Sequence, residues 1–531
     1  MVGVRRRASV ARAAVVGAVL VVCAAGPAAS YAGAPRPTVC VVSFNGPDEA
    51  SVFRALLPEA QFAFVDLAPV NGPGATGASS ANASGDGGRR SWIYDACRPD
   101  LQCDVVVYAA EFAGRFFGAR PFSLSLQDME EASCQRRCDG IFHHPQEVFL
   151  LACNTLATKD QDRRTPDEYR QVLLEHGFDR ASAERVVAFR YGPLGPSFRE
   201  ALRRIFAGVP RVYGFGSVAP KGEYTAPLLA RYLRARRDYA EYLEREVGRT
   251  DPNVPLLTAF HKTALIQASG LGRSDPGASD RNAVCALYDE RTGVRDRLRI
   301  ARDLMSRENF LAFVPTLQVF LERHPPPDFD AGSRALFADM QALDPPRDRV
   351  VGLVHELDVS ALQLELAHFA LQMHWITADE LRHIAVDGAK HLLSGPLTSE
   401  VVDVMCEISK QVPLGDTFES RDFPPALFDV DEGIRMVDCV HPSDPDVTVR
   451  LVATLDGGDP SRRAWAAYAL SRRLPLDDAT LMRLAKYLDD PLPDLRARVA
   501  WTLRAQGRVS TQVLAAVRAR DPGLAAELPT S

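Results

Sequence analysis

The stretch EVFLLAC (147–153) is an apolar run that ends at Cys153, and the polar residues Asn154 and Thr155 follow at once. A short apolar run bounded by polar residues is typical of a strand buried inside a sheet. Its last residue leaves two alternatives open. The Cys153 thiol is a nucleophile at the tip of a buried strand, or it is a small apolar side chain that packs well there, as cysteine often does.

Four further stretches have the same apolar, β-rich character, and helical patterns separate them. Apolar strands that alternate with helices are typical of an α/β unit with a mainly parallel sheet. We therefore predict a three-layer α/β domain over residues 38–245, with helices on both faces of the sheet. A long helix is expected over 226–248. The other predicted strands are TVCVVSF (38–44), QFAFVDL (61–67), DVVVYAA (104–110) and RVYGF (211–215).

Beyond about residue 275 the strand-like runs fade, which predicts an all-α region over 275–531. A weak repeat with a constant offset of 33 residues (496 minus 463) appears near the end of the chain, and a repeat of this length favours stacked helix pairs. These residues resemble HEAT-type helical repeats, most clearly over 440–520; a generic helical bundle is the alternative. The repeated residues are Arg463, Ala467 and Leu470, then Arg496, Ala500 and Leu503.

The first thirty residues have a basic start, an apolar middle and a small-residue end. This is the layout of a secretory signal peptide, so we expect residues 1–30 to be removed and the protein to be exported. A lipid anchor at Cys23 is the alternative, although the bulky Val22 before it argues against one. No later segment has the length of an apolar membrane helix. Residues 69–90, rich in Gly, Ala and Ser, predict a flexible insert.

The composition is that of an ordinary folded protein, with 46% apolar residues, 24% charged residues and a net charge of −6. No basic block follows the N-terminus, so nucleic acid is not an expected partner. The close cysteine pairs, Cys97 with Cys103 and Cys134 with Cys138, fit disulfides in an exported protein, although spacing does not fix the connectivity. Neither pair has the spacing of a zinc site, and no cofactor or metal is expected.

Two neighbouring strands are expected to end in residues with reactive side chains. DVVVYAA is followed by Glu111, and EVFLLAC closes on Cys153. In a right-handed β-helix-β crossover the C-terminal ends of both strands lie at one edge of the sheet, where open α/β sheets place their sites. We therefore expect Glu111 and Cys153 to face one another there.

The stretches VFLLACNT and RVYGFGSVAP resemble the caspase-like cysteine peptidases, which include the gingipain, clostripain and separase types. The resemblance covers about residues 38–245. In that family one strand ends in a His-Gly motif and the next closes on a cysteine, so it implies that Cys153 is the nucleophile. It also implies that backbone amides near Gly114 stabilise the oxyanion. The chain departs from the family at the base, because Glu111 stands where the family has histidine.

This departure matters because a carboxylate does the opposite of an imidazole. Its reference pKa of about 4.3 lies far below the value of about 8.5 for a thiol, and its charge disfavours a nearby thiolate. His143 and His144 lie at the start of the cysteine strand, about 20 Å from its end. His176 and His261 are further candidates for the base, and sequence does not place them.

Two functions follow. The first is an exported caspase-like cysteine hydrolase, a peptidase or a degenerate relative, whose helical region recruits a protein or peptide. The second is a non-catalytic protein-binding scaffold, in which the helical array does the work. For Glu111 the plain alternative is a solvated carboxylate paired with Arg115 or Arg120.

Overall fold

The computed structural model describes residues 36–529 except for 45–47, 69–90, 118–122, 159–163, 177, 179, 192–196, 358–359, 394–396, 398, 413, 419, 441–444 and 458. The expected signal peptide, with Cys23, and the expected insert over 69–90 therefore lie outside the described residues.

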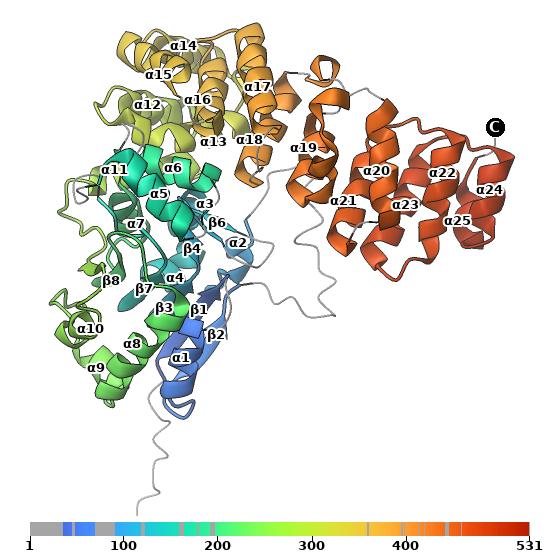
Figure 1. The fold of residues 1–531 in the computed structure, drawn as a ribbon. Coiled ribbons are helices and arrows are strands. Elements are labelled where there is room, and N and C mark those ends of the chain that lie inside the picture. The colour runs from blue at the N-terminus through green and yellow to red at the C-terminus, as the bar shows by residue number, and fades with distance from the viewer. Residues whose placement is uncertain are drawn as a thin grey trace, which may run out of the picture. The chain divides into compact units, whose positions relative to one another are not determined.

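The centre of the α/β domain is a sheet with the strand order β2-β1-β3-β7-β8-β9 (Figure 1). The neighbours from β2 to β8 run parallel, and β9 pairs antiparallel with β8. The five predicted strands are confirmed, except that the cysteine strand ends at Leu151. The strands are β1 Thr38–Ser43, β2 Ala63–Asp66, β3 Val105–Ala109, β7 Glu147–Leu151, β8 Arg211–Phe215 and β9 Leu265–Ala268.

Successive side chains of the central strands point to opposite faces, and both faces are covered by helices. Val106, Val148 and Leu150 share one apolar core with α3–α7, whereas Val107 and Phe149 share another with α1 and α8–α10. The helices are α1 Asp48–Leu56, α2 Ile93–Ala96, α3 Leu126–Ser133, α4 Asp139–Phe142, α5 Pro166–Glu175, α6 Arg180–Tyr191, α7 Phe198–Ile205, α8 Gly222–Ala235, α9 Tyr239–Arg245 and α10 Val254–Ala259.

Three features of this domain differ from the sequence prediction. The long helix expected over 226–248 is two helices, because α8 ends at Ala235 and α9 begins only at Tyr239. Strand β9 lies beyond residue 245, so the sheet extends past the predicted domain boundary. A small antiparallel sheet, which the sequence did not indicate, follows β3; its strands are β4 Glu111–Phe112, β5 Arg115–Phe117 and β6 Leu124–Ser125.

The rest of the chain is helical within the described residues, as predicted (Figure 1). The helices are α11 Ala278–Tyr288, α12 Val294–Met305, α13 Val314–Arg323, α14 Ala331–Gln341, α15 Asp344–Glu356, α16 Ser360–Gln372, α17 Ala378–Leu393, α18 Ser399–Gln411, α19 Asp431–Val440, α20 Pro445–Gly457, α21 Pro460–Ser471, α22 Asp478–Ala485, α23 Pro493–Ala505, α24 Thr511–Arg518 and α25 Pro522–Glu527. No helix of the described part combines the length and the apolar character that a bilayer crossing requires.

The helices from α19 onward pack on each other in two alternating rows. Helix α19 packs on α21 and α21 on α23, while α20 packs on α22 and α22 on α24. The predicted repeat falls on equivalent helices of one row, since Arg463 lies in α21 and Arg496 in α23. Leu470 and Leu503 are both fully buried in the seam. Asp459 caps α21 by accepting bonds from the amides of Ser461 and Arg462.

The disulfides do not join the close cysteine pairs that the sequence suggested. Cys134 and Cys138 do not share a helix face, because α3 ends at Ser133 and the chain turns before Cys138. Each cysteine reaches instead a partner far away in sequence, and several disulfides fit a protein of an oxidising, extracellular compartment. The pairs are Cys40–Cys103, Cys97–Cys138, Cys134–Cys285 and Cys406–Cys439.

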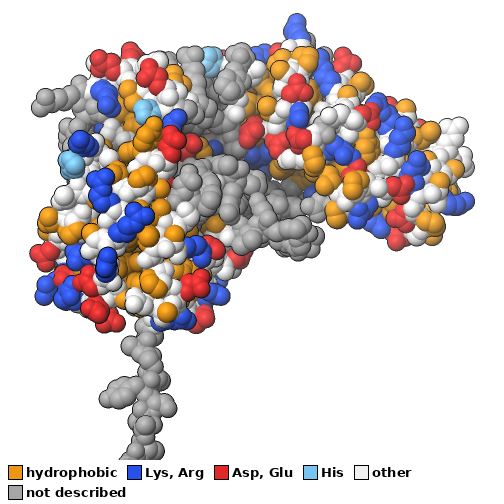
Figure 2. Space-filling view, turned by 60° about the horizontal axis from the view of Figure 1, so that its bottom comes forward, with side chains coloured by type: hydrophobic (Ala, Val, Ile, Leu, Met, Phe, Trp, Pro, Cys, Tyr) orange, Lys and Arg blue, Asp and Glu red, His pale blue; other side chains and the backbone are white. Residues whose placement is uncertain are grey.

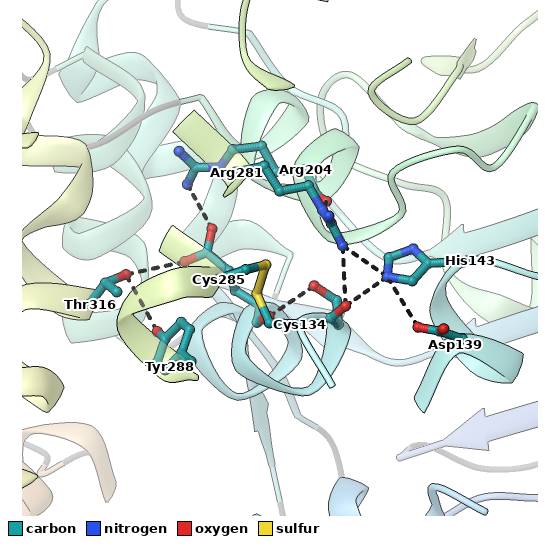
Figure 3. The surroundings of a disulfide bond; sticks show 10 residues. Cys134, Asp139, His143, Arg204, Arg281, Cys285, Tyr288 and Thr316 are labelled. Carbon is teal, nitrogen blue, oxygen red and sulfur yellow. Dashed lines mark hydrogen bonds and ion pairs between the residues drawn. A yellow bond between two sulfur atoms is a disulfide. The ribbon is translucent and has the colours of Figure 1, made fainter. Parts of the chain in front are cut away.

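One of these disulfides fastens the α/β domain to the helical region (Figure 3). Cys134 follows α3 directly, and Cys285 lies in α11. Close by, the Arg323 guanidinium of α13 donates two bonds of 2.8 Å to the Glu131 carboxylate of α3. The junction therefore combines a covalent link with a bidentate ion pair.

Candidate functional site

The turn after β7 presents Cys153 at the carboxyl edge of the sheet. The Thr155 hydroxyl donates to the carbonyls of Leu150 and Ala152, both at 3.2 Å, and accepts a bond of 3.1 Å from the Phe215 amide of β8. Asn154 adopts φ of 62°, a left-handed conformation that asparagine tolerates better than most residues. These contacts fold the chain back sharply and fix the place of Cys153.

A buried polar network around Asn154 holds the turn after β7 in place. Asn154 and Arg190 are almost fully buried, and the Asn154 Oδ1 accepts bonds from the Arg190 guanidinium, at 3.1 Å, and from the Tyr169 hydroxyl. The Arg190 guanidinium also lies over the Tyr169 ring, 4.4 Å from its centre. The Asn154 amide nitrogen of the main chain donates to the Ser217 carbonyl at 2.8 Å. Helices α5 and α6 and the loop after β8 thus all converge on Asn154.

The thiol of Cys153 is half-buried and is the free thiol among the described cysteines. It packs against the apolar cores on both faces of the sheet, as a residue at the sheet edge should. The Ala219 amide donates a hydrogen bond of 3.3 Å to the sulfur. Burial nevertheless raises the pKa of the thiol to about 11, with the charge of Glu111 adding to it and the Ala219 bond opposing it.

Glu111 lies at the same edge of the sheet. Strands β3 and β7 are parallel neighbours in which Ala109 pairs with Leu151, so Glu111 and Cys153 each follow a paired position by two residues. The charge of the Glu111 carboxylate raises the pKa of the Cys153 thiol. Glu111 does not end in a loop, however; it begins β4 and pairs with Phe117 of β5.

Gly114 is the residue near which the resemblance implies an oxyanion-stabilising amide. It forms the turn between β4 and β5 with φ of 82°, and its carbonyl accepts a bond of 3.3 Å from the Leu126 amide. It lines a separate cavity of about 430 Å³ beside α3 and α7, whose lining includes neither Glu111 nor Cys153. The backbone amide that reaches the sulfur is that of Ala219, which the sequence analysis did not single out.

The histidines considered as a base have other partners. The two nitrogens of the His143 ring lie 3.0 Å from the Ala207 carbonyl and 2.7 Å from the Ser133 carbonyl. His144 lies 3.9 Å from Asp104, and the exposed His176 and His261 contact carbonyls of their own helices. Among the described residues, no histidine contributes to the shift of the Cys153 pKa.

A second buried polar cluster lies at the opposite end of β7. The carboxylate of Glu147 is fully buried, and the Arg211 guanidinium donates to it at 3.1 Å. The hydroxyls of Tyr213 and Tyr239 donate at 2.5 and 2.6 Å. A charge so enclosed by donors is a structural ion pair, and it faces away from the Cys153 edge. Sequence reasoning missed it, because its partners come from β8 and α9.

No group of three or more His, Cys, Asp and Glu side chains within the described ranges is arranged to hold a metal ion. Comparisons of the chain with protein-family models, curated proteins and solved structures gave no significant match. The features of the molecule that bear on function are therefore the Cys153 edge of the sheet and the helical region.

Proposed function

We propose that this is an exported, non-catalytic protein-binding protein. Its α/β domain is a degenerate relative of the caspase-like cysteine peptidases, and its helical array, HEAT-like in the repeat over 440–520, binds a protein or peptide. The observation that carries the proposal is the environment of the Cys153 thiol, which has a carboxylate where the family has an imidazole.

The arrangement of the sheet supports the family relationship. Glu111 and Cys153 follow adjacent parallel strands at one edge, which is where the resemblance requires the base and the nucleophile. A cysteine placed two residues beyond β7 by chance would not need a carboxylate two residues beyond the neighbouring β3. We infer that the position is inherited and that the chemistry has been lost.

The chemistry of the pair supports the loss. A thiol with a pKa of about 11 is ionised to about one part in ten thousand at pH 7, and the thiolate is the nucleophilic form. Glu111 cannot correct this, because a carboxylate is too weak a base to take the proton and its charge opposes the thiolate. The hydrogen bonds that favour the thiolate, from the main chain at Ala219 and at Cys153 itself, do not offset burial.

The helical region supplies a surface suited to binding. Successive helices from α19 to α24 pack in two rows, and stacked helices of this kind present extended surfaces to partners. The disulfide and ion pair at the junction with α3 hold this region to a rigid α/β support.

The decisive experiment measures the reactivity of Cys153. The full-length protein is treated with iodoacetamide across pH 6–10, and the tagged peptide is quantified by mass spectrometry. We expect labelling slower than that of a free model thiol at every pH, rising without a plateau up to pH 10. Labelling that is fast at pH 7, with a plateau below pH 8, would overturn the proposal.

A cysteine hydrolase is the second candidate, and the Ala219 hydrogen bond to the sulfur is the observation that favours it. The variant Glu111→His separates the two. Peptidase activity that appears only in the variant identifies the natural protein as degenerate, whereas activity of the natural protein, lost on Cys153→Ala, identifies a hydrolase. Glu244→Gln, an exposed carboxylate on α9, is the matched control.

A further inference from the structure

Three helices of one row, α19, α21 and α23, carry a continuous series of stacked arginine and aromatic side chains. The Arg435 guanidinium lies over the Trp465 ring, 5.4 Å from its centre, and Trp465 meets Tyr468 edge to face at 5.9 Å. The Arg498 guanidinium lies 4.4 Å from the centre of the Tyr468 ring. We define the Arg–aromatic face as these contacts together with two further residues: Arg435, Trp465, Tyr468, Arg472, Arg498 and Trp501.

This face is exposed to solvent at Arg472 and Trp501 and half-buried at Arg435, Trp465 and Arg498. Trp501 lies one helical turn after Arg498 and is 49% exposed, which is high for so large an apolar side chain. The Arg472 side chain is 40% exposed, while Tyr468 beneath it is buried and anchors the stack. Figure 2 shows basic, acidic and apolar side chains interspersed over the C-terminal helices on the side in view.

Basic charge dominates the exposed part of the face. Its acidic neighbours are used internally: Asp438 is 6% exposed and accepts a bond of 3.2 Å from Arg472, and Asp431 accepts one from the Ser461 hydroxyl. The second oxygen of Asp438, Oδ1, is buried without a hydrogen bond in the described part of the chain. Arg472 therefore supplies exposed charge on the face, while Arg435 and Arg498 are half-buried beside the aromatic rings.

The chemistry of this face is that of a binding site. Trp, Tyr and Arg are the residues enriched among interface hot spots. Their stacking fixes the guanidinium groups before any partner arrives, which lowers the entropy lost on binding. Planar guanidinium groups favour carboxylates, to which they donate two parallel bonds.

We propose that the Arg–aromatic face binds an extended acidic segment of a partner protein. The inference deepens the proposed function and rests on it, because it names the class of partner that the helical array takes. A nucleic acid, whose phosphates would attract the same guanidinium groups, is the alternative that the oligonucleotide in the test detects.

The test uses the full-length protein and fluorescein-labelled peptides of the repeat Glu-Gly-Phe, with the repeats Gln-Gly-Phe and Lys-Gly-Phe and a single-stranded oligothymidine of the same length. Binding is measured by fluorescence anisotropy at two salt concentrations. The variants are Arg498→Gln and Trp501→Ala. Matched controls away from the face are Arg508→Gln, an exposed arginine after α23, and Met482→Ala, an exposed apolar residue of α22.

We expect the Glu peptide to bind best and more weakly at high salt. Each face variant should weaken binding about tenfold or more, and each control less than about twofold. Arg498→Lys should recover only part of the loss, because lysine keeps the charge without the planar stack. Circular dichroism confirms that the variants are folded.

Three results would overturn the inference: no binding of the Glu peptide, equal losses in face and control variants, or tighter binding of the oligonucleotide. Preferential binding of the Gln or Lys peptide that Trp501→Ala abolishes would reject the acidic partner and leave the binding function in place. The labelling of Cys153 in the same preparation tests the non-catalytic α/β domain separately.

Discussion

Glu111 and Cys153 each follow the paired residues Ala109 and Leu151 by two positions, and the Glu111 carboxylate raises the pKa of the Cys153 thiol. The two residues follow adjacent parallel strands at one edge of the sheet, and the charge of Glu111 disfavours the thiolate of Cys153. An imidazole at position 111 would become a cation on taking the proton and would stabilise the thiolate. The carboxylate is already an anion near neutral pH and repels it.

Removing that charge should make the thiol more reactive. We predict that Glu111→Gln lowers the pKa of Cys153 and raises its alkylation rate at pH 7.5 by roughly twofold to threefold, because burial, the larger cause of the shift, remains. The rate is read from the alkylated Cys153 peptide against Glu244→Gln. An unchanged rate in Glu111→Gln would show that the two side chains do not interact.

Asn154 should be the residue of this edge least tolerant of substitution. Asn154→Ala leaves the buried Arg190 and Tyr169 without their shared acceptor and places a Cβ-bearing residue at φ of 62°. We expect a loss of about 3 kcal/mol, and about 1 kcal/mol less for Asn154→Gly, because glycine relieves the backbone while losing the same bonds. Urea denaturation followed through the α/β domain measures both, and equal losses would contradict the role of the backbone.

The fold of the first half was largely predictable, because strands buried on both faces have a local sequence pattern, a short run of apolar residues. Glu147 shows where that information ends. It opens the best predicted strand, yet its carboxylate is fully buried, because its partners Arg211, Tyr213 and Tyr239 come from strands and helices more than sixty residues away. The spacing of residues along the chain therefore cannot predict this buried cluster.

The site shows the same division. The edge that holds Glu111 and Cys153 follows from strand order, and alternating strands and helices specify that order. The Ala219 amide was not predictable as a partner of Cys153, because a backbone donor has no sequence signal. The Arg190 contact with Asn154 was not predictable either, because an arginine in a helix usually lies at the solvent-exposed surface. A partial signal existed in GFGSVAP, whose glycine-containing loop after β8 runs against Cys153 and Asn154. The prediction of the disulfide pairs was wrong for a related reason, because cysteines close in sequence were assumed to be close in space.

The disulfide at the junction should stabilise the protein more than the one inside the helical region. Cys134–Cys285 spans 151 residues and Cys406–Cys439 spans 33. By loop-closure entropy, replacing the first pair by serines should cost about 5 kcal/mol, and replacing the second about 1 kcal/mol less. Thermal unfolding ranks the two variants. Hydrogen exchange should become faster at α3 and α11 only in the first variant. A larger stability loss in the second variant would contradict the prediction.

His143 should make the same junction sensitive to acid. Its ring lies between the carbonyls of Ala207 and Ser133, 2.9 Å from the Arg281 guanidinium and 4.0 Å from the Asp139 carboxylate (Figure 3). Burial lowers the pKa of His143, and the charge of Arg281 lowers it further, while the carbonyls and Asp139 oppose the shift.

A histidine whose pKa is lowered by folding binds its proton more readily in the unfolded chain. The free energy of unfolding should therefore fall as the pH drops below the ordinary histidine value of about 6.5, and it should stop falling below the lowered pKa. We predict that His143→Gln reduces this acid loss between pH 7 and pH 5, whereas His261→Gln, an exposed histidine of the same domain, leaves it unchanged. Unfolding in urea at each pH measures the slopes. Parallel curves for the natural protein and His143→Gln would mean that the ring is already protonated in the folded state, held by both carbonyls and Asp139 against the charge of Arg281.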